Sequence, residues 1–109
     1  MKKYQLGEFE EIVLLTVAVL HGDAYGVSIR KDMETRLERT VSIGAMQTAL
    51  RRMEDKGYLT SEFGEATQER GGKRKRYFTV TSFGKQALKD AKDARTKLWD
   101  AIPSYVLGV

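Results

Sequence analysis

The sequence predicts a mainly α-helical domain with one small β-hairpin. Four segments carry apolar residues at intervals of three and four, which is typical of helices that are buried on one side. Between the third and fourth segments, two short runs that favour strands flank the pair Gly71-Gly72. With 109 residues the chain has the size of one domain and can bury a modest core.

The first helix is predicted over residues 7–20. Apolar residues follow helical spacing there, and the segment is almost wholly apolar after Glu11. Glu8, Glu10 and Glu11 lie in the first turn, where the helix dipole favours negative charge. The β-branched residues would also suit a strand, but the length and the acidic start favour a helix. We therefore expect the most buried helix of the domain here.

The second helix is predicted over about residues 24–39, after a turn at His21-Gly22-Asp23. Its apolar residues repeat every fourth position and form one stripe. The stripe consists of Tyr25, Ile29, Met33 and Leu37.

The third helix is predicted over about residues 43–56, with Ser42 as its N-cap and Gly57 as its stop. One face forms a buried stripe of Ile43, Met46, Leu50 and Met53. The opposite face is small at its start, then polar, then cationic. That face consists of Ala45, Gln47, Thr48, Arg51 and Arg52.

Two strands and a last helix complete the prediction. Residues 58–63 and 74–80 are expected to pair as a hairpin with a polar loop over 64–73. Thr81 caps a helix over about residues 82–101, which Pro103 stops.

This order of elements is the winged helix-turn-helix plan with an added C-terminal helix. In that plan the second helix of the turn enters the major groove of DNA and the hairpin, or wing, lies along the backbone or minor groove. We expect a winged helix-turn-helix DNA-binding domain over residues 1–81. A C-terminal dimerisation helix and tail over 82–109 would form one compact unit with it.

Residues 69–76, with the sequence ERGGKRKR, carry the whole net charge of +4. A charge run of this kind is often only a solvated loop. Its place on a hairpin just after a cationic helix favours contact with phosphates instead.

An ordered set of short motifs covers residues 6 to about 90. The set consists of Leu6-Gly7-Glu8-Phe9, Ala24-Tyr25-Gly26, Ser42-Ile43-Gly44, the run from Leu50 to Gly57, the run from Glu69 to Phe78, and Thr81 with Gly84. With these motifs the chain resembles the PadR family of bacterial transcriptional regulators. The resemblance implies a homodimeric winged-helix repressor of an inverted-repeat operator in double-stranded DNA. The short C-terminus resembles the subfamily with one dimerisation helix, which includes multidrug-sensing repressors.

The recognition helix departs from the family pattern. Family members usually carry a run like Thr-Leu-Tyr-Pro, where this chain has Ala45-Met46-Gln47-Thr48. Gln47 replaces an aromatic residue that often touches the DNA backbone. A glutamine can instead pair with adenine through two hydrogen bonds.

The predicted DNA contacts have different roles. Ala45, Gln47 and Thr48 would face base edges, and Arg51 and Arg52 would meet phosphates. Arg70 or Lys73 could enter a narrow minor groove. Tyr25 has two interpretations: packing in the core or between helices, or contact with the DNA backbone. The full predicted set is Tyr25, Ser42, Gly44, Ala45, Gln47, Thr48, Arg51, Arg52, Arg70, Gly71, Gly72, Lys73, Arg74, Lys75 and Arg76.

The last helix is expected to form the dimer through Leu88, Ala91, Leu98, Trp99 and Ile102. Trp99 has a second interpretation, as a wall of an effector pocket between the last helices. Glu8 would then attract a cationic partner, although a solvated first turn explains it too. The effector class is thus a small aromatic or cationic molecule.

Other classes of protein find little support in the sequence. With one histidine and no cysteine we expect no metal site, no cofactor and no enzyme. The apolar run over 12–20 is too short to cross a bilayer, so the expected location is cytoplasmic, with no membrane partner. Two alternatives remain open: a nucleic-acid binder without sequence specificity, and a winged-helix protein-interaction module.

Overall fold

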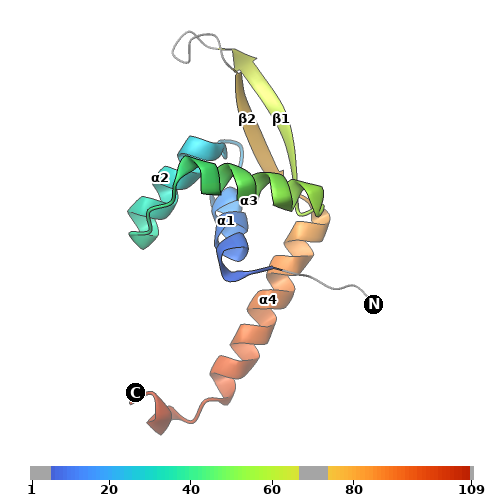
Figure 1. Ribbon diagram of the computed structural model, residues 1–109. Helices are drawn as coiled ribbons and strands as arrows, with labels where there is room; N and C mark the ends of the chain where they lie inside the picture. The colour runs from blue at the N-terminus through green and yellow to red at the C-terminus, as the bar shows by residue number, and fades with distance from the viewer. Residues whose placement is uncertain (1–5, 67–73, 109) are drawn as a thin grey trace.

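The computed structural model describes residues 6–66 and 74–108, and it has the predicted order of elements (Figure 1). The fold is mainly helical with one two-stranded hairpin. The elements are α1 (Glu8–Val19), α2 (Gly26–Leu37), α3 (Ile43–Asp55), β1 (Leu59–Ala66), β2 (Arg74–Val80) and α4 (Ser82–Ala101), followed by a 3-10 turn over Ser104–Val106.

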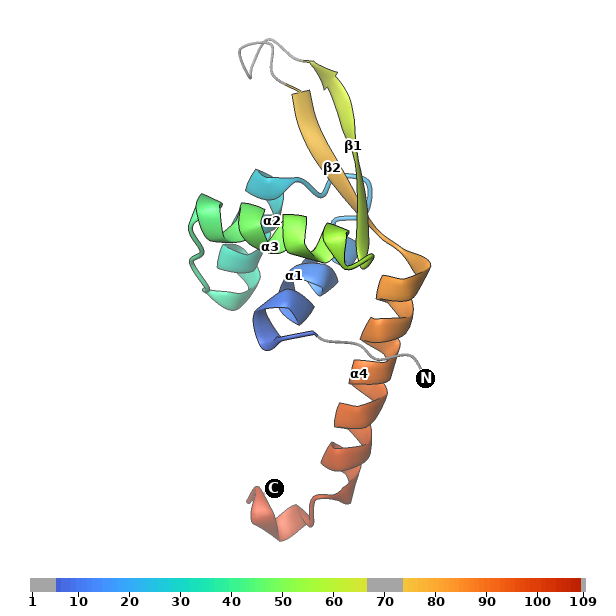
Figure 2. The same ribbon diagram turned by 45° about the vertical axis from the view of Figure 1, so that its right-hand side comes forward.

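The core forms around α1, as predicted. Val13, Leu14 and Val17 of α1 are buried, and side chains from α2, α3 and the start of the hairpin pack around them. The large neighbours that are fully buried are Ile29, Met33, Met46, Met53, Tyr58 and Leu59. In Figure 2, α1 lies below α2 and α3, so the core fixes the position of both helices of the turn.

Three predicted helix boundaries are confirmed by their hydrogen bonds or backbone angles. The Ser42 hydroxyl accepts from the Ala45 N–H at 3.1 Å, and the Thr81 hydroxyl accepts from the Gly84 N–H at 3.0 Å. Gly57 follows α3 with a φ of +87°, a conformation that favours glycine. The predicted apolar stripes are wrong at two positions, because Leu37 is 50 % exposed and Ile43 is 41 % exposed.

The wing is an antiparallel hairpin in which Leu59 pairs with Val80 and Phe63 with Arg76. The first strand is longer than predicted: residues 64–66, expected as loop, continue β1 after a register irregularity. The base of the wing is tied to the start of α2, because the Phe78 N–H donates to the Ala24 carbonyl at 2.8 Å. The strands therefore project from the helical core at a fixed point (Figure 1).

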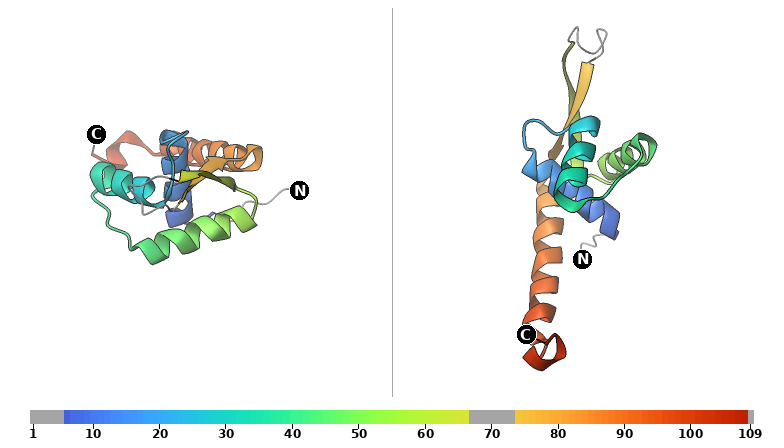
Figure 3. Two further views of the ribbon diagram at one scale, coloured as in Figure 1. Left: turned by 90° about the horizontal axis from the view of Figure 1, so that it is seen from above. Right: turned by 90° about the vertical axis from the view of Figure 1, so that its left-hand side faces the viewer.

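The first two turns of α4 are anchored in the winged domain. The Phe83 ring stacks on the Tyr58 ring with centroids 5.0 Å apart, and Ala87 is buried. Gly84 lies so close to the Tyr58 carbonyl that a β-carbon there would collide with it. Further along, an Arg95 guanidinium nitrogen pairs with Glu11 of α1 at 2.8 Å. Only the last turns of α4 extend beyond the domain, and their end and the wing lie at opposite ends of the molecule (Figure 3).

Candidate nucleic-acid interface

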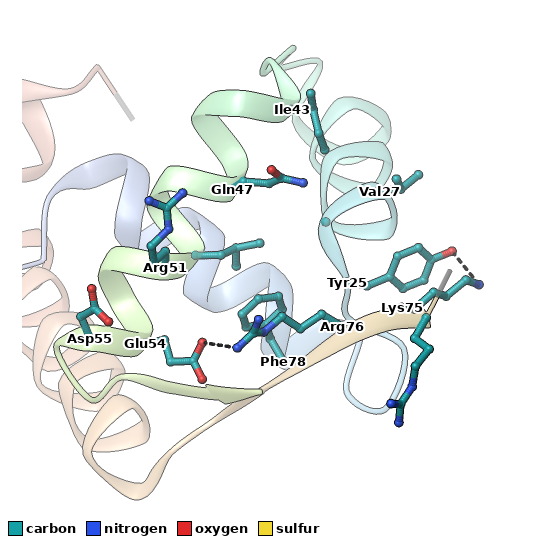
Figure 4. Close-up of a pocket in the computed structure, with 13 residues that line it drawn as sticks. Tyr25, Val27, Ile43, Gln47, Arg51, Glu54, Asp55, Lys75, Arg76 and Phe78 are labelled. Atoms are coloured by element: carbon teal, nitrogen blue, oxygen red, sulfur yellow. Dashed lines mark hydrogen bonds and ion pairs between the residues drawn. The ribbon is translucent and has the colours of Figure 1, made fainter. Parts of the chain in front are cut away.

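A groove of about 710 Å³ separates α3 from the wing, with the start of α2 at its side (Figure 4). Four cationic side chains line it: Arg51 from α3, and Arg74, Lys75 and Arg76 from β2. Two acids, Glu54 and Asp55, also line the groove. The groove therefore brings together cations that were predicted separately on the recognition helix and on the wing.

The α3 side of the groove presents the predicted reading residues. Gln47 and Arg51 lie one turn apart and extend from the same helix toward the groove (Figure 4). Ala45, Thr48 and Arg52 are exposed on the same helix. A side chain at Gly44 would meet no atom within 4 Å. The N-terminal half of α3 is thus open to a large partner.

The two wing arginines are held by short contacts to the wing itself. The Arg74 Nε donates to the Gly64 carbonyl at 2.8 Å, and the Arg76 Nε donates to the Ser61 hydroxyl at 2.8 Å. Their guanidinium carbons lie 5.5 and 5.0 Å from the centroid of the Phe63 ring, which is 52 % exposed. Guanidinium groups pack favourably over aromatic faces, and both arginines contact the Phe63 ring in this way.

Lys75 points to the other side of β2, toward Tyr25. Its Nζ lies 4.4 Å from the centroid of the Tyr25 ring and 3.4 Å from the phenol oxygen. The Tyr77 ring meets Tyr25 edge-on at 5.6 Å. Packing was one of the two interpretations of Tyr25, but it was expected in the core or between helices, whereas the ring packs against β2 of the wing. Its hydroxyl also points along the wing beside Lys75 (Figure 4), so a backbone contact stays a prediction.

Glu54, Ser61 and Phe63 take part in this site, and sequence reasoning did not single them out as site residues. Ser61 donates to a Glu54 carboxylate oxygen at 2.7 Å, and an Arg76 guanidinium nitrogen lies 3.7 Å from the other oxygen. One signal for them was available. Because Phe63 pairs with Arg76, strand alternation puts Ser61, Phe63 and Arg76 on one face of the hairpin.

Four predicted contacts of the wing tip, Arg70, Gly71, Gly72 and Lys73, lie outside the described residues. Their part in the interface stays a prediction.

The predicted dimer residues differ in their exposure. Leu98 and Trp99 are 71 % and 62 % exposed near the far end of α4, and Ala91 and Ile102 are half-buried. Leu88 is also half-buried, but it packs against the core of its own chain. The open part of the predicted interface is therefore the C-terminal half of α4.

The two residues proposed for an effector pocket do not meet within one chain. Glu8 pairs with Arg39 at 2.8 Å, and this hydrogen bond and charge hold the pKa of Glu8 below its usual value. A smaller pocket of about 390 Å³ lies between α1 and α4. Its lining is Glu11, Leu15, Leu88, Lys89, Lys92, Arg95 and Thr96, which includes neither Glu8 nor Trp99.

The part of the chain that the structure describes contains neither a membrane span nor a metal-ligand cluster. Its helices are all too short or too polar to span a bilayer. Within residues 6–66 and 74–108, no three carboxylate or histidine side chains cluster as metal ligands would.

An exposed recognition helix beside a wing, with both contributing cations to one groove, defines the class of winged-helix DNA-binding transcriptional regulators. The model of the PadR-like family of transcriptional regulators matches residues 14–90, and the chain belongs to this family.

Solved structures share the fold. A PadR-like transcription factor from Bacteroides fragilis is 24 % identical with a TM-score of 0.71, and the match covers 84 % of each chain. A PadR family regulator from Clostridium difficile is 28 % identical with a TM-score of 0.67, covering 87 % of this chain and 97 % of that one. Bacillus subtilis PadR, solved with operator DNA, is 19 % identical with a TM-score of 0.64, covering 79 % of this chain and 47 % of that one. A comparison with curated proteins found no match.

Proposed function

We propose that this chain is a homodimeric repressor that binds an inverted-repeat operator in double-stranded DNA. The observation that carries the proposal is that Arg51, Arg74, Lys75 and Arg76 all line one groove beside the open half of α3. The solved PadR of Bacillus subtilis, which shares this fold, is a complex with operator DNA. A duplex is therefore the partner that fits the groove best.

We expect different DNA contacts from the two sides of the groove. Ala45, Gln47 and Thr48 lie on the open half of α3, where they would meet base edges in the major groove. Arg51 and the wing cations would bind phosphates, releasing counterions and fixing the register without reading sequence. Since Gln47 is a neutral side chain with a donor and an acceptor, adenine is the base that it would pair with.

Dimerisation would place two such surfaces on one operator. Leu98 and Trp99 are large apolar side chains left in solvent, and covering them with a second copy of α4 would remove that exposure. A two-fold axis through paired α4 helices would bring the two α3 helices to successive major grooves, about 34 Å apart. The operator would then be an inverted repeat.

An effector that binds between the paired α4 helices would control the complex. The operator is released if the effector binds more tightly to a dimer whose α3 helices have the wrong spacing. Trp99 is the aromatic surface on which a small aromatic or cationic molecule would stack. Binding of such a molecule would relieve repression.

Selection of bound sequences from random duplex DNA tests the proposal. We expect recovered duplexes to contain two inverted half-sites whose centres are about 10 base pairs apart. Recovered and scrambled duplexes are then compared at the same salt concentration, because phosphate binding alone is salt-dependent. Equal affinity for both would leave a binder without specificity. Unchanged DNA affinity after neutralising Arg51 and Arg74 would instead indicate a protein-interaction module.

A further inference from the structure

Glu54, Ser61 and Arg76 form a bridge between the end of α3 and the wing. Ser61 donates to one Glu54 oxygen at 2.7 Å and accepts from the Arg76 Nε at 2.8 Å. The second Glu54 oxygen lies 3.7 Å from an Arg76 Nη. Each of the three residues contacts the other two, so the bridge connects α3 with both strands of the wing.

The bridge is one of two contacts that hold β2 from opposite sides. Neighbouring residues of a strand point to opposite faces, and Lys75 and Arg76 are neighbours. Lys75 packs on Tyr25 at the start of α2, while Arg76 reaches Glu54 on α3 (Figure 4). The wing therefore has a support on each helix of the turn, above the backbone contact of Phe78 with Ala24 at its base.

Attraction of phosphates does not explain why Glu54, an anion, lines this groove. An anion that lines a groove built for a polyanion repels the phosphates that the groove should bind. Its carboxylate instead engages Arg76 and Ser61. Because a guanidinium has five N–H donors, Arg76 can keep this contact and still offer hydrogen bonds to DNA.

We infer that Glu54 and Ser61 are positioning residues that set the angle of the wing relative to the recognition helix. With the bridge in place, the base contacts of α3 and the phosphate contacts of the wing fall on one DNA register at the same time. Without it, the wing still attracts phosphates, but in many registers. This inference rests on the proposed function and deepens it, because it names the residues that couple the two contact surfaces.

The central test compares Glu54→Gln with Asp55→Asn in the whole 109-residue chain. Both variants remove one negative charge from the same end of α3, in the same groove, so electrostatics alone predicts that both bind DNA more tightly. We expect Asp55→Asn to follow that rule. We expect Glu54→Gln to bind the selected duplex about fivefold more weakly than Asp55→Asn does, since the carboxylate charge that holds Arg76 is lost. Scrambled duplex should bind equally well to both.

Ser61→Ala provides a variant without any change in charge. It should lower the preference for the selected duplex and leave the salt dependence of scrambled-duplex binding unchanged, because no phosphate contact is removed. In NMR spectra of the protein without DNA, the Arg76 Nε–H should exchange faster with water in Ser61→Ala than in the parent protein. Thermal unfolding of each variant shows whether it is folded at the temperature of the titrations.

The outcomes separate the two levels of the proposal. If the parent protein shows no preference between selected and scrambled duplex, the proposed function fails and this inference with it. If the parent protein has the preference but Glu54→Gln matches Asp55→Asn on both duplexes, the inference alone is overturned. An Arg76 Nε–H that exchanges equally fast in the parent protein and in Ser61→Ala would also overturn it.

Discussion

The groove between α3 and the wing differs from the far end of α4 in how its side chains are supported. In the groove, Arg74, Lys75 and Arg76 are each held by a hydrogen bond or an aromatic ring of the same chain. At the far end of α4, Leu98 and Trp99 extend into solvent on a helix that has left the domain. The first surface is supported within one chain, and the second is not.

This difference indicates what each surface is built to meet. Side chains already fixed in place lose little conformational freedom when they bind, which suits a partner of regular shape such as a duplex. Large apolar side chains on an isolated helix favour a partner that removes them from water. Four changes, taken from the largest expected effect to the smallest, test this comparison.

Leu98→Asp should abolish the dimer, because the charge would have to be buried between two α4 helices. Sedimentation should show a monomer over concentrations at which the parent protein is a dimer. Lys97→Asp is the matched control, since helical spacing turns position 97 away from the predicted stripe, and it should stay dimeric. A dimeric Leu98→Asp variant would place the interface elsewhere.

Replacing Lys73, Arg74 and Arg76 together with alanine should weaken binding to every duplex. If each cation meets one phosphate, the slope of log affinity against log salt should fall by about 3. Titrations at several salt concentrations with selected and scrambled DNA measure that slope. An unchanged slope would contradict the assignment of the wing as the phosphate-binding surface.

Gln47→Ala should change which sequences are bound while leaving nonspecific affinity intact. Loss of a two-hydrogen-bond contact with adenine costs about 1–3 kcal/mol of discrimination at that base. The measurement is competition between the selected duplex and duplexes substituted at single positions. Equal losses on all duplexes would show that Gln47 reads no base.

Arg39→Gln should have the smallest effect, on the pH dependence of stability. Arg39 holds the pKa of Glu8 low, so this pair stabilises the fold above the usual glutamate pKa, and the contribution disappears as pH falls through the lowered value. Thermal unfolding should therefore show the variant slightly less stable than the parent protein at pH 7 and equal to it in strong acid. Lys31→Gln, which removes an exposed cation on α2, should not show this convergence. A constant difference across pH would exclude the Glu8 contact as its cause.

Local signals predicted most of the fold. Ser42 and Thr81 cap their helices because a hydroxyl at that position can accept a backbone N–H, which depends only on nearby residues. The return strand, residues 74–80, and the last helix, residues 82–101, have the predicted bounds. The predicted burial of Leu37 and Ile43 was wrong because periodicity identifies a face of a helix and does not show how far that face is covered. Both residues lie at helix ends, where that face continues past the elements that cover it.

The candidate site was predictable only in part. The cations of the wing and of α3 were visible as a charge run and a helix face. The partners of those cations were not, because the contact of Glu54 with Arg76 joins residues on different elements and depends on how the hairpin leaves α3. The role of Phe63 was hidden in the same way, since an aromatic residue in a strand is usually read as core.

Because α4 is anchored in the domain at Gly84, a tilt of this helix at its far end would move the domain. With 20 residues α4 is about 30 Å long, so a tilt of about 10° at one end moves the other by about 5 Å. That displacement exceeds the rise of about 3.4 Å between base pairs. Close packing of Gly84 on the Tyr58 carbonyl restricts movement of α4 relative to the domain at this end. In the proposed homodimer, a small rotation where two α4 helices meet would therefore be amplified into a shift of at least one base pair at the DNA.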